Sequence, residues 1–152
     1  MELTVREARL TDIDRVSSLI ERADDRWSSA QLGSAADLLR QLVYLPNAAV
    51  IVVMDGRQLM GLAVLTLRPS VASGGLIGNL DLLAVEPGHE YAGVSETLVN
   101  EVIRSARNKG CVLLEVPRPG DPGALAQWEA LGFDEEGVRL SRSLTGSPAA
   151  HH

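Results

Sequence analysis

The residues best suited to chemistry lie between positions 79 and 95. Alternation predicts a strand over Leu76–Val85 and places Asn79 and Asp81 on one of its faces. A carboxylate there can act as a general base, or it can tie down a neighbouring strand by hydrogen bonding. Pro87–Gly88 ends the strand, and a helix is predicted to begin at Gly93. The first N–H groups of such a helix lack partners and can hold a phosphate without a basic side chain.

Cys111 and His89 also carry side chains that could do chemistry, but the sequence around each of them does not indicate a reactive site. Cys111 opens an apolar strand and is interpreted as a small core residue, because no sequence feature marks it as a reactive thiolate. His89 lies in a predicted loop with no second histidine or cysteine nearby, so we predict no metal site.

Hydrophobic periodicity predicts the element order β-α-α-β-β-β-α-β-α-β. A hairpin-rich first half followed by a βαβ unit is typical of an α/β fold with a mixed, mostly antiparallel sheet and helices on both faces. Within the strand that leads to the helix at Gly93, one face is expected to carry Asn79, Asp81, Leu83 and Val85, and the other Leu80, Leu82 and Ala84. The expected strands are Leu3–Ala8, Ala48–Met54, Gln58–Leu67, Leu76–Val85, Cys111–Val116 and Val138–Leu144, and the helices are expected to be capped or opened by Thr11, Ser34, Gly93 and Asp121.

Length and composition narrow the class of protein. A chain of 152 residues, 45% apolar and 22% charged, suits one globular domain over residues 1–144, followed by a disordered tail or tag remnant over 145–152. The net charge of −6 argues against a nucleic-acid partner, and no apolar run is long enough to cross a membrane. A single cysteine and a start unlike a signal peptide predict a cytoplasmic protein. Lys109 is the only lysine, and the other 13 basic residues are arginine. This preference for arginine over lysine suggests a bacterial genome rich in G and C.

Two segments carry a resemblance to the GNAT superfamily of acyl-CoA-dependent N-acyltransferases. The first is Leu83-Ala84-Val85-Glu86-Pro87, a strand end that leads through a loop into a helix. The second runs from Asp121 to Phe133 and ends in Trp128-Glu129-Ala130-Leu131-Gly132-Phe133, similar to the closing helix of that family. The predicted element order is also similar to that of the family, along roughly residues 1–144.

The resemblance implies an N-acetyltransferase that moves an acetyl group from acetyl-CoA, its co-substrate, to a primary amine of a small molecule or a peptide. It implies that Asp81 acts as the base, with Tyr91 as a source of the returned proton, because Trp128 stands where the family often has a tyrosine. It assigns Trp27 and Asn79 to the acceptor site. The residues that it assigns to the cofactor are Leu83, Val85, Glu90, Tyr91, Ala92, Gly93, Val94, Ser95, Asp121 and Trp128.

The sequence leaves alternatives open. Glu90 stands where the family has an amide or a guanidinium, and no lysine or arginine occurs from 69 to 103. A GNAT-fold binding or regulatory domain without turnover is therefore the second interpretation, and a homodimer is compatible with either. A nucleotide-binding domain is less attractive, because no glycine-rich turn follows the first strand.

Overall fold

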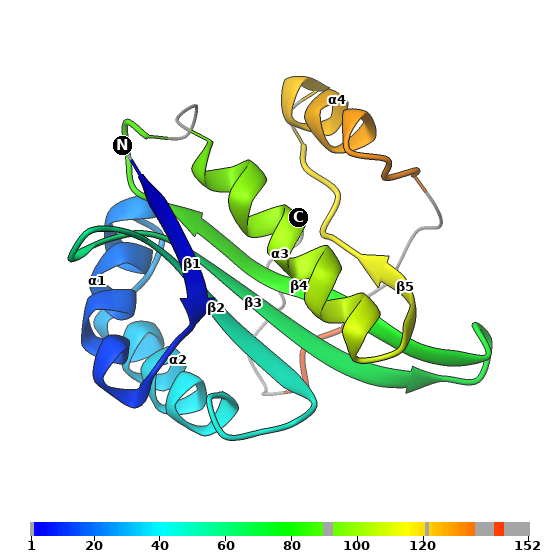
Figure 1. Cartoon of the computed structure of the whole chain (residues 1–152). Helices are drawn as coiled ribbons and strands as arrows, with labels where there is room; N and C mark the ends of the chain where they lie inside the picture. Colours follow the sequence, from blue (N-terminus) through cyan, green and yellow to red (C-terminus); the bar gives the residue numbers. More distant parts are fainter. Residues whose placement is uncertain (1, 90–92, 121, 136–141, 145–152) are drawn as a thin grey trace. The chain divides into compact units, whose positions relative to one another are not determined.

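The computed structural model describes residues 2–89, 93–120, 122–135 and 142–144, which form two compact units divided between Pro117 and Arg118. Within the described residues, the first unit holds the five strands and three of the α-helices (Figure 1). Its elements are β1 (Leu3–Glu7), the 3-10 helix η1 (Leu10–Asp12), α1 (Ile13–Ala23), α2 (Ser29–Leu42), β2 (Ala48–Asp55), β3 (Gln58–Ser70), β4 (Gly75–Val85), α3 (Val94–Asn108) and β5 (Cys111–Glu115).

The five strands form one sheet in sequence order, β1-β2-β3-β4-β5. The first three pairings are antiparallel, and β4 pairs with β5 in parallel because α3 carries the chain back along the sheet between them. The predicted mixed, mostly antiparallel α/β architecture is confirmed.

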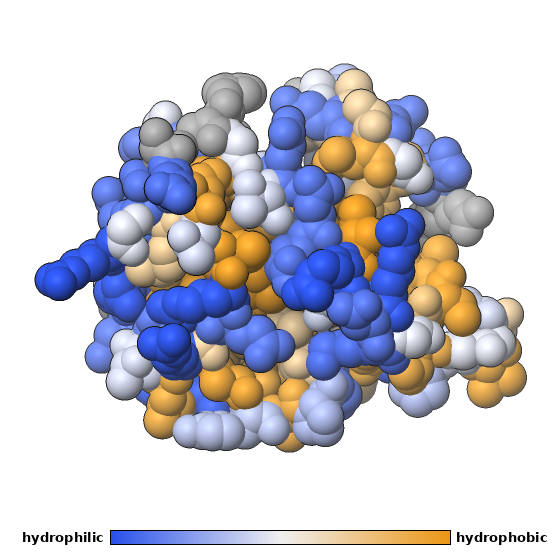
Figure 2. All heavy atoms as spheres, in the orientation of Figure 1, coloured by the Kyte–Doolittle hydropathy of each residue, from blue (hydrophilic) through white to orange (hydrophobic). Residues whose placement is uncertain are grey.

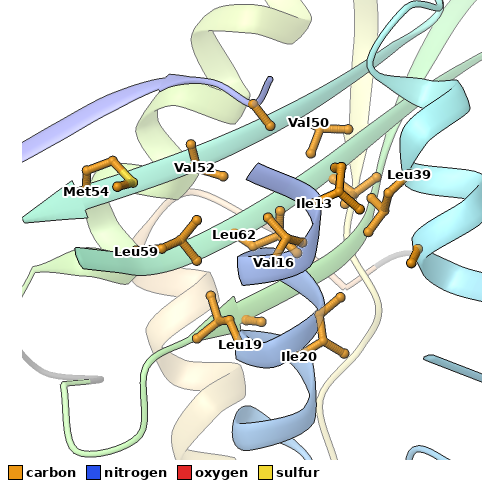
Figure 3. Packing of buried hydrophobic residues seen from close by; sticks show 14 residues of the cluster. Ile13, Val16, Leu19, Ile20, Leu39, Val50, Val52, Met54, Leu59 and Leu62 are labelled. Carbon is orange, nitrogen blue, oxygen red and sulfur yellow. The ribbon is translucent and has the colours of Figure 1, made fainter. Parts of the chain in front are cut away.

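Helices α1 and α2 cover one face of the sheet. Ile13, Val16, Leu19 and Ile20 of α1 are each at most 2% exposed, as their helical spacing predicts. They pack against a β-branched and leucine-rich surface of the central strands (Figure 3). The strand residues in this cluster include Val50, Val52, Met54, Leu59, Leu62, Val64 and Ala84.

Helix α3 covers the opposite face, and a glycine of β3 lets it approach the sheet. A Cβ built on Gly61 would lie 2.7 Å from Cγ1 of Val94 and 2.8 Å from Cδ1 of Leu98, so only glycine fits beneath the first turns of α3. At the other end of the helix, a Cβ on Gly78 would lie 3.5 Å from Cβ of Ala106, an ordinary van der Waals distance, so the approach of α3 does not require glycine there. Hydrophilic side chains follow the outward face of α3 (Figure 2).

Helix α1 begins differently from the prediction. Thr11 was expected to cap it, but Asp12 is the residue that organises this end of the molecule. Its carboxylate, 1% exposed as a residue, accepts two hydrogen bonds from Arg6, one from Arg15 and one from the backbone N–H of Arg9, at 2.7–3.1 Å. The Arg6 guanidinium holds the pKa of this carboxyl well below its usual range, although burial opposes the shift.

Helix α2 begins earlier in the sequence than predicted. Ser34 was predicted to cap it, but Ser28 is the N-cap and forms a capping box with Gln31. The Gln31 N–H donates to the Ser28 hydroxyl at 3.1 Å, and the Ser28 N–H donates to the Gln31 amide oxygen at 2.8 Å. The polar break between the helices therefore shrinks to residues 24–28, and Gly33 lies inside α2.

The second unit contains α4 (Pro122–Ala130), with proline at the predicted first helical position. Gly132 follows with a φ of 93°, and the N–H of Phe133 donates to the Trp128 carbonyl at 3.2 Å. The two rings meet edge to face, with centroids 5.1 Å apart. Residues 138–141 of the expected last strand lie outside the described residues, and 142–144 form no strand. No helix of the described chain is both long and apolar enough to cross a membrane.

Candidate functional site

The main feature of the site is a parting of two parallel strands. β4 and β5 pair only from Leu76↔Cys111 to Asn79↔Glu115. On its other side β4 stays paired with β3 as far as Val85. Over 80–85, β4 therefore has no ladder to β5, and no other strand of the described residues pairs with it on that edge.

A β-bulge lies at the point where the strands part. Leu82 pairs with Val64 and Leu80 pairs with Leu65, so that Asp81 is the extra residue on β4. The Asp81 side chain is exposed. Asp81, the candidate base, is therefore the bulged residue, and it lies two positions after Asn79, where the β4–β5 ladder ends.

The bulge also overturns the predicted faces of β4. Asn79 was expected to share a face with Leu83 and Val85, but the added residue reverses the alternation between them. Leu83 and Val85 are half-buried and pair with Ala63 and Gly61, on the face covered by α3. Asn79 pairs with Thr66, and its side chain lies on the face opposite α3. Further along the sheet, α1 and α2 cover that face. Leu80, expected on the face opposite Leu83, lies on the α3 face.

Glu115 is a functional candidate that the sequence did not indicate. It ends β5 opposite Asn79 and forms an ion pair with Arg68 of β3, with Nη2 and Oε2 3.5 Å apart. The register places Arg68, Asn79 and Glu115 on the same face. A carboxylate and an amide thus lie side by side where β4 and β5 part, although 36 positions separate them in the sequence. No local motif marks Glu115.

The loop after β4 leads to the start of α3. Gly93 is the N-cap of α3 with a φ of 83°, a left-handed conformation that favours glycine, and it has no side chain of its own to cap the helix. Thr97 closes the first turn through its N–H and its hydroxyl, both of which donate to the Gly93 carbonyl. Val94 is buried and Ser95 is half-buried. Among the described residues, no side chain is seen to accept from the first-turn N–H groups, so the anion-binding role of this helix start stays a prediction.

Three of the predicted cofactor residues, Glu90, Tyr91 and Ala92, lie outside the described residues. Asp121 does so as well. Trp128 belongs to the second unit, where it packs on Phe133. Their roles stay predictions.

The charges around this loop are more balanced than the sequence indicates. Glu86 forms a two-pronged ion pair with Arg22, which α1 brings to it from 64 positions away. Glu101 is paired with Arg104 one turn along α3. No lysine or arginine occurs from 69 to 103 in the sequence, but the fold brings the guanidinium of Arg22 to Glu86.

Trp27, His89 and Cys111 are the remaining candidates from the sequence. Trp27 is half-buried against the core just before α2, and it lines a hollow of about 420 Å³ with α2 residues as far as Leu38. His89 is half-buried, with its Nδ1 3.3 Å from the Pro87 carbonyl oxygen. Burial raises the pKa of the Cys111 thiol, so the structure gives it no reactive character. Among the described residues, no group of three metal-binding side chains occurs.

The family model described as Acetyltransferase (GNAT) family matches residues 16–133. No match is found among the curated proteins.

Solved structures share the fold at low identity. A transcriptional regulator from Bacillus halodurans C-125 is 23% identical with a TM-score of 0.77, covering 92% of this chain and 99% of that chain. An acetyltransferase from Trypanosoma brucei is 22% identical with a TM-score of 0.72, and the match covers 94% of this chain and 100% of that chain. AAC(6')-Iy is 20% identical with a TM-score of 0.78, and the match covers 94% of this chain and 99% of that chain. Its structure was solved in complex with the bisubstrate analogue CoA-S-monomethyl-acetylneamine.

Proposed function

We propose that this chain, which belongs to the acetyltransferase (GNAT) family, transfers the acetyl group of acetyl-CoA to a primary amine of a small molecule or a peptide. The proposal treats residues 1–144 as one catalytic domain, because the family match extends across both compact units. The lone cysteine and the acidic composition are compatible with a cytoplasmic enzyme that acts without nucleic acid, as a monomer or a homodimer.

The observation that carries this proposal is the unpaired edge of β4 next to the end of β5. The pantetheine arm of acetyl-CoA is an extended chain with two amide groups. Such a chain can pair with the backbone of Leu83 and Val85 as an added strand would. The pyrophosphate would then meet the first N–H groups of α3 at Gly93, Val94 and Ser95.

The proposed chemistry needs a base at the bulge. The amine nitrogen attacks the thioester carbonyl carbon, a C–N bond forms and the C–S bond breaks. Asp81, directly or through water, accepts the proton that the amine loses, and the departing thiolate takes up a proton. Tyr91 is the proposed donor, while the Trp128 indole N–H can only donate a hydrogen bond to the sulfur.

The proposed acceptor is cationic before it reacts. Glu115 and Asn79 would receive the amine at the parting of the strands, where Arg68 already attracts the same carboxylate. Trp27 is proposed as a more distant wall of the acceptor site. Because AAC(6')-Iy is named for its action on aminoglycosides, polycationic amines are a suitable first class of compounds to test.

The test is release of free thiol from acetyl-CoA by the whole chain with a panel of primary amines, against acetate esters and alcohols as controls. The proposal expects amine-dependent thiol release that ceases in Asp81→Asn. If acetyl-CoA binds but no amine supports turnover, the second interpretation, a binding or regulatory domain, replaces catalysis. The structural neighbour described as a transcriptional regulator is compatible with that outcome.

A further inference from the structure

The ion pair between Arg22 and Glu86 joins two segments that are distant in sequence. Arg22 lies in the last turn of α1, and Glu86 is the first residue after β4. Nε and Nη2 of Arg22 donate to the two carboxylate oxygens of Glu86 at 3.2 and 2.7 Å. The Glu86 side chain is only 16% exposed, against 47% for Arg22, so the loop partner is the more enclosed of the two.

Glu86 is also fixed through its backbone. Its N–H donates to the Met60 carbonyl at 2.8 Å, which extends the pairing of β3 and β4 past Val85. Its carbonyl accepts from the N–H of His89 at 3.0 Å. Proline and a glycine with a φ of 84° occupy the two positions between, which is typical of a type II turn. Three contacts therefore hold the residue from which the chain turns toward α3.

From this geometry we infer that Arg22 is a positioning residue for the turn over residues 86–89, which follows the proposed cofactor edge of β4, and that it acts through Glu86. The guanidinium fork fixes the carboxylate in one orientation and thereby the start of the turn. The turn over residues 86–89 is the described part of the connection from β4 to α3, whose first N–H groups are the proposed phosphate site. The ligand part of this inference rests on the proposed function, since it concerns the affinity for acetyl-CoA.

A simpler account assigns the pair an electrostatic role only, and the two accounts predict opposite results for one variant. If charge alone matters, Glu86→Gln removes a negative charge near the phosphates and tightens acetyl-CoA binding. If positioning matters, the same change releases the turn and weakens binding. Arg22→Gln weakens binding under both accounts, so Glu86→Gln separates them.

The first measurement needs no cofactor. Amide hydrogen exchange at Glu86 and His89 is measured by NMR in the whole chain. Arg22→Gln and Glu86→Gln should each speed exchange at His89 by about fivefold or more, since its hydrogen bond then opens more often. Arg22→Lys keeps the charge but loses the fork, and should give an intermediate rate. Arg40→Gln is the matched control, because Arg40 is 43% exposed and pairs with Asp14 and Asp37 between α1 and α2.

The second measurement is the dissociation constant for acetyl-CoA by calorimetry. Each single variant should weaken binding by about threefold to tenfold, and the double variant should be no weaker than either single one, because both remove the same contact. Arg40→Gln should bind as the unchanged protein does. Tighter binding by Glu86→Gln, additive losses, or unchanged exchange in Arg22→Gln would each overturn the inference. If the unchanged protein binds no acetyl-CoA, the proposed function fails, and the exchange rates alone decide whether Arg22 positions the turn.

Discussion

Asn79 and Glu115 face each other in the last pair of the β4–β5 ladder, and beyond this pair β4 continues to Val85 without β5. The pair therefore marks the edge of the opening in which the acyl transfer is proposed to occur. Its two side chains offer an amide and a carboxylate to whatever amine enters on that face.

Replacing Glu115 by glutamine should weaken binding of a cationic acceptor. A partly exposed charge contact of this kind contributes about 1 kcal/mol, so the KM for the amine should rise about fivefold while kcat and the acetyl-CoA affinity stay unchanged. Steady-state kinetics with both substrates varied measures this. Glu101→Gln, which removes a paired carboxylate on α3, serves as the control. An unchanged KM for the amine would remove Glu115 from the acceptor site.

Asp81→Asn should slow turnover without weakening acetyl-CoA binding. Loss of a general base lowers kcat by about 100-fold or more, whereas the exposed Asp81 side chain holds no described partner whose loss would disturb the fold. Thiol-release kinetics and calorimetry separate the two effects. Glu96→Gln, another exposed carboxylate on the first turn of α3, should keep its kcat. Full activity of Asp81→Asn would place the base elsewhere.

Gly93→Ala and Gly33→Ala form a matched pair for the start of α3. A Cβ at either position meets nothing within 4 Å, so only backbone conformation distinguishes them. Gly93 has a φ of 83°, and alanine there should cost about 1 kcal/mol of stability and disturb the first-turn N–H groups. Gly33 lies within α2, and alanine there should stabilise the fold by about 0.5–1 kcal/mol. Denaturant unfolding measures both. Equal effects would contradict the capping geometry.

Asp12→Asn should destabilise the protein at neutral pH. The variant leaves Arg6 and Arg15 without their buried partner, a change that costs about 3 kcal/mol. Asp37→Asn is the control, because its carboxylate is 75% exposed and should matter little.

The pH dependence of Asp12 has a definite sign. The pKa of its carboxyl is lowered in the folded protein, so its contribution to the free energy of unfolding is fully present above the unfolded value of about 3.9. The contribution is lost as the pH falls through the folded value. The stability difference between the protein and Asp12→Asn should therefore be constant near neutrality and shrink in acid. A difference that grows below pH ~4 would contradict the assignment.

Much of the fold could be predicted from the sequence because it depends on local signals. The Asp55–Gly56 turn forms, with Gly56 at a φ of 60°. Gly93 and Gly110 stand at the ends of α3 with positive φ, and Pro122 opens α4. Each follows from a preference of one or two residues for a particular backbone conformation.

The site could be predicted less well because it depends on register and on distant partners. The bulge at Asp81 comes from the pairing of β3 with β4, so alternation alone placed Asn79 on the wrong face. Glu115 and Arg22 reach the site through tertiary contacts and belong to no local motif. The misplaced cap of α2 has a different cause: Ser28 and Ser34 both offer hydroxyls, and only the fold selects between them.

The most direct test of the account is titration of the whole chain with acetyl-CoA by calorimetry. The β4 edge beyond Asn79 and the first N–H groups of α3 at Gly93 together predict binding of one acetyl-CoA per chain, weakened in Gly93→Ala and unaffected in Gly33→Ala. No heat of binding at millimolar acetyl-CoA, or equal affinities for the two glycine variants, would contradict the claim that this opening holds the acyl donor.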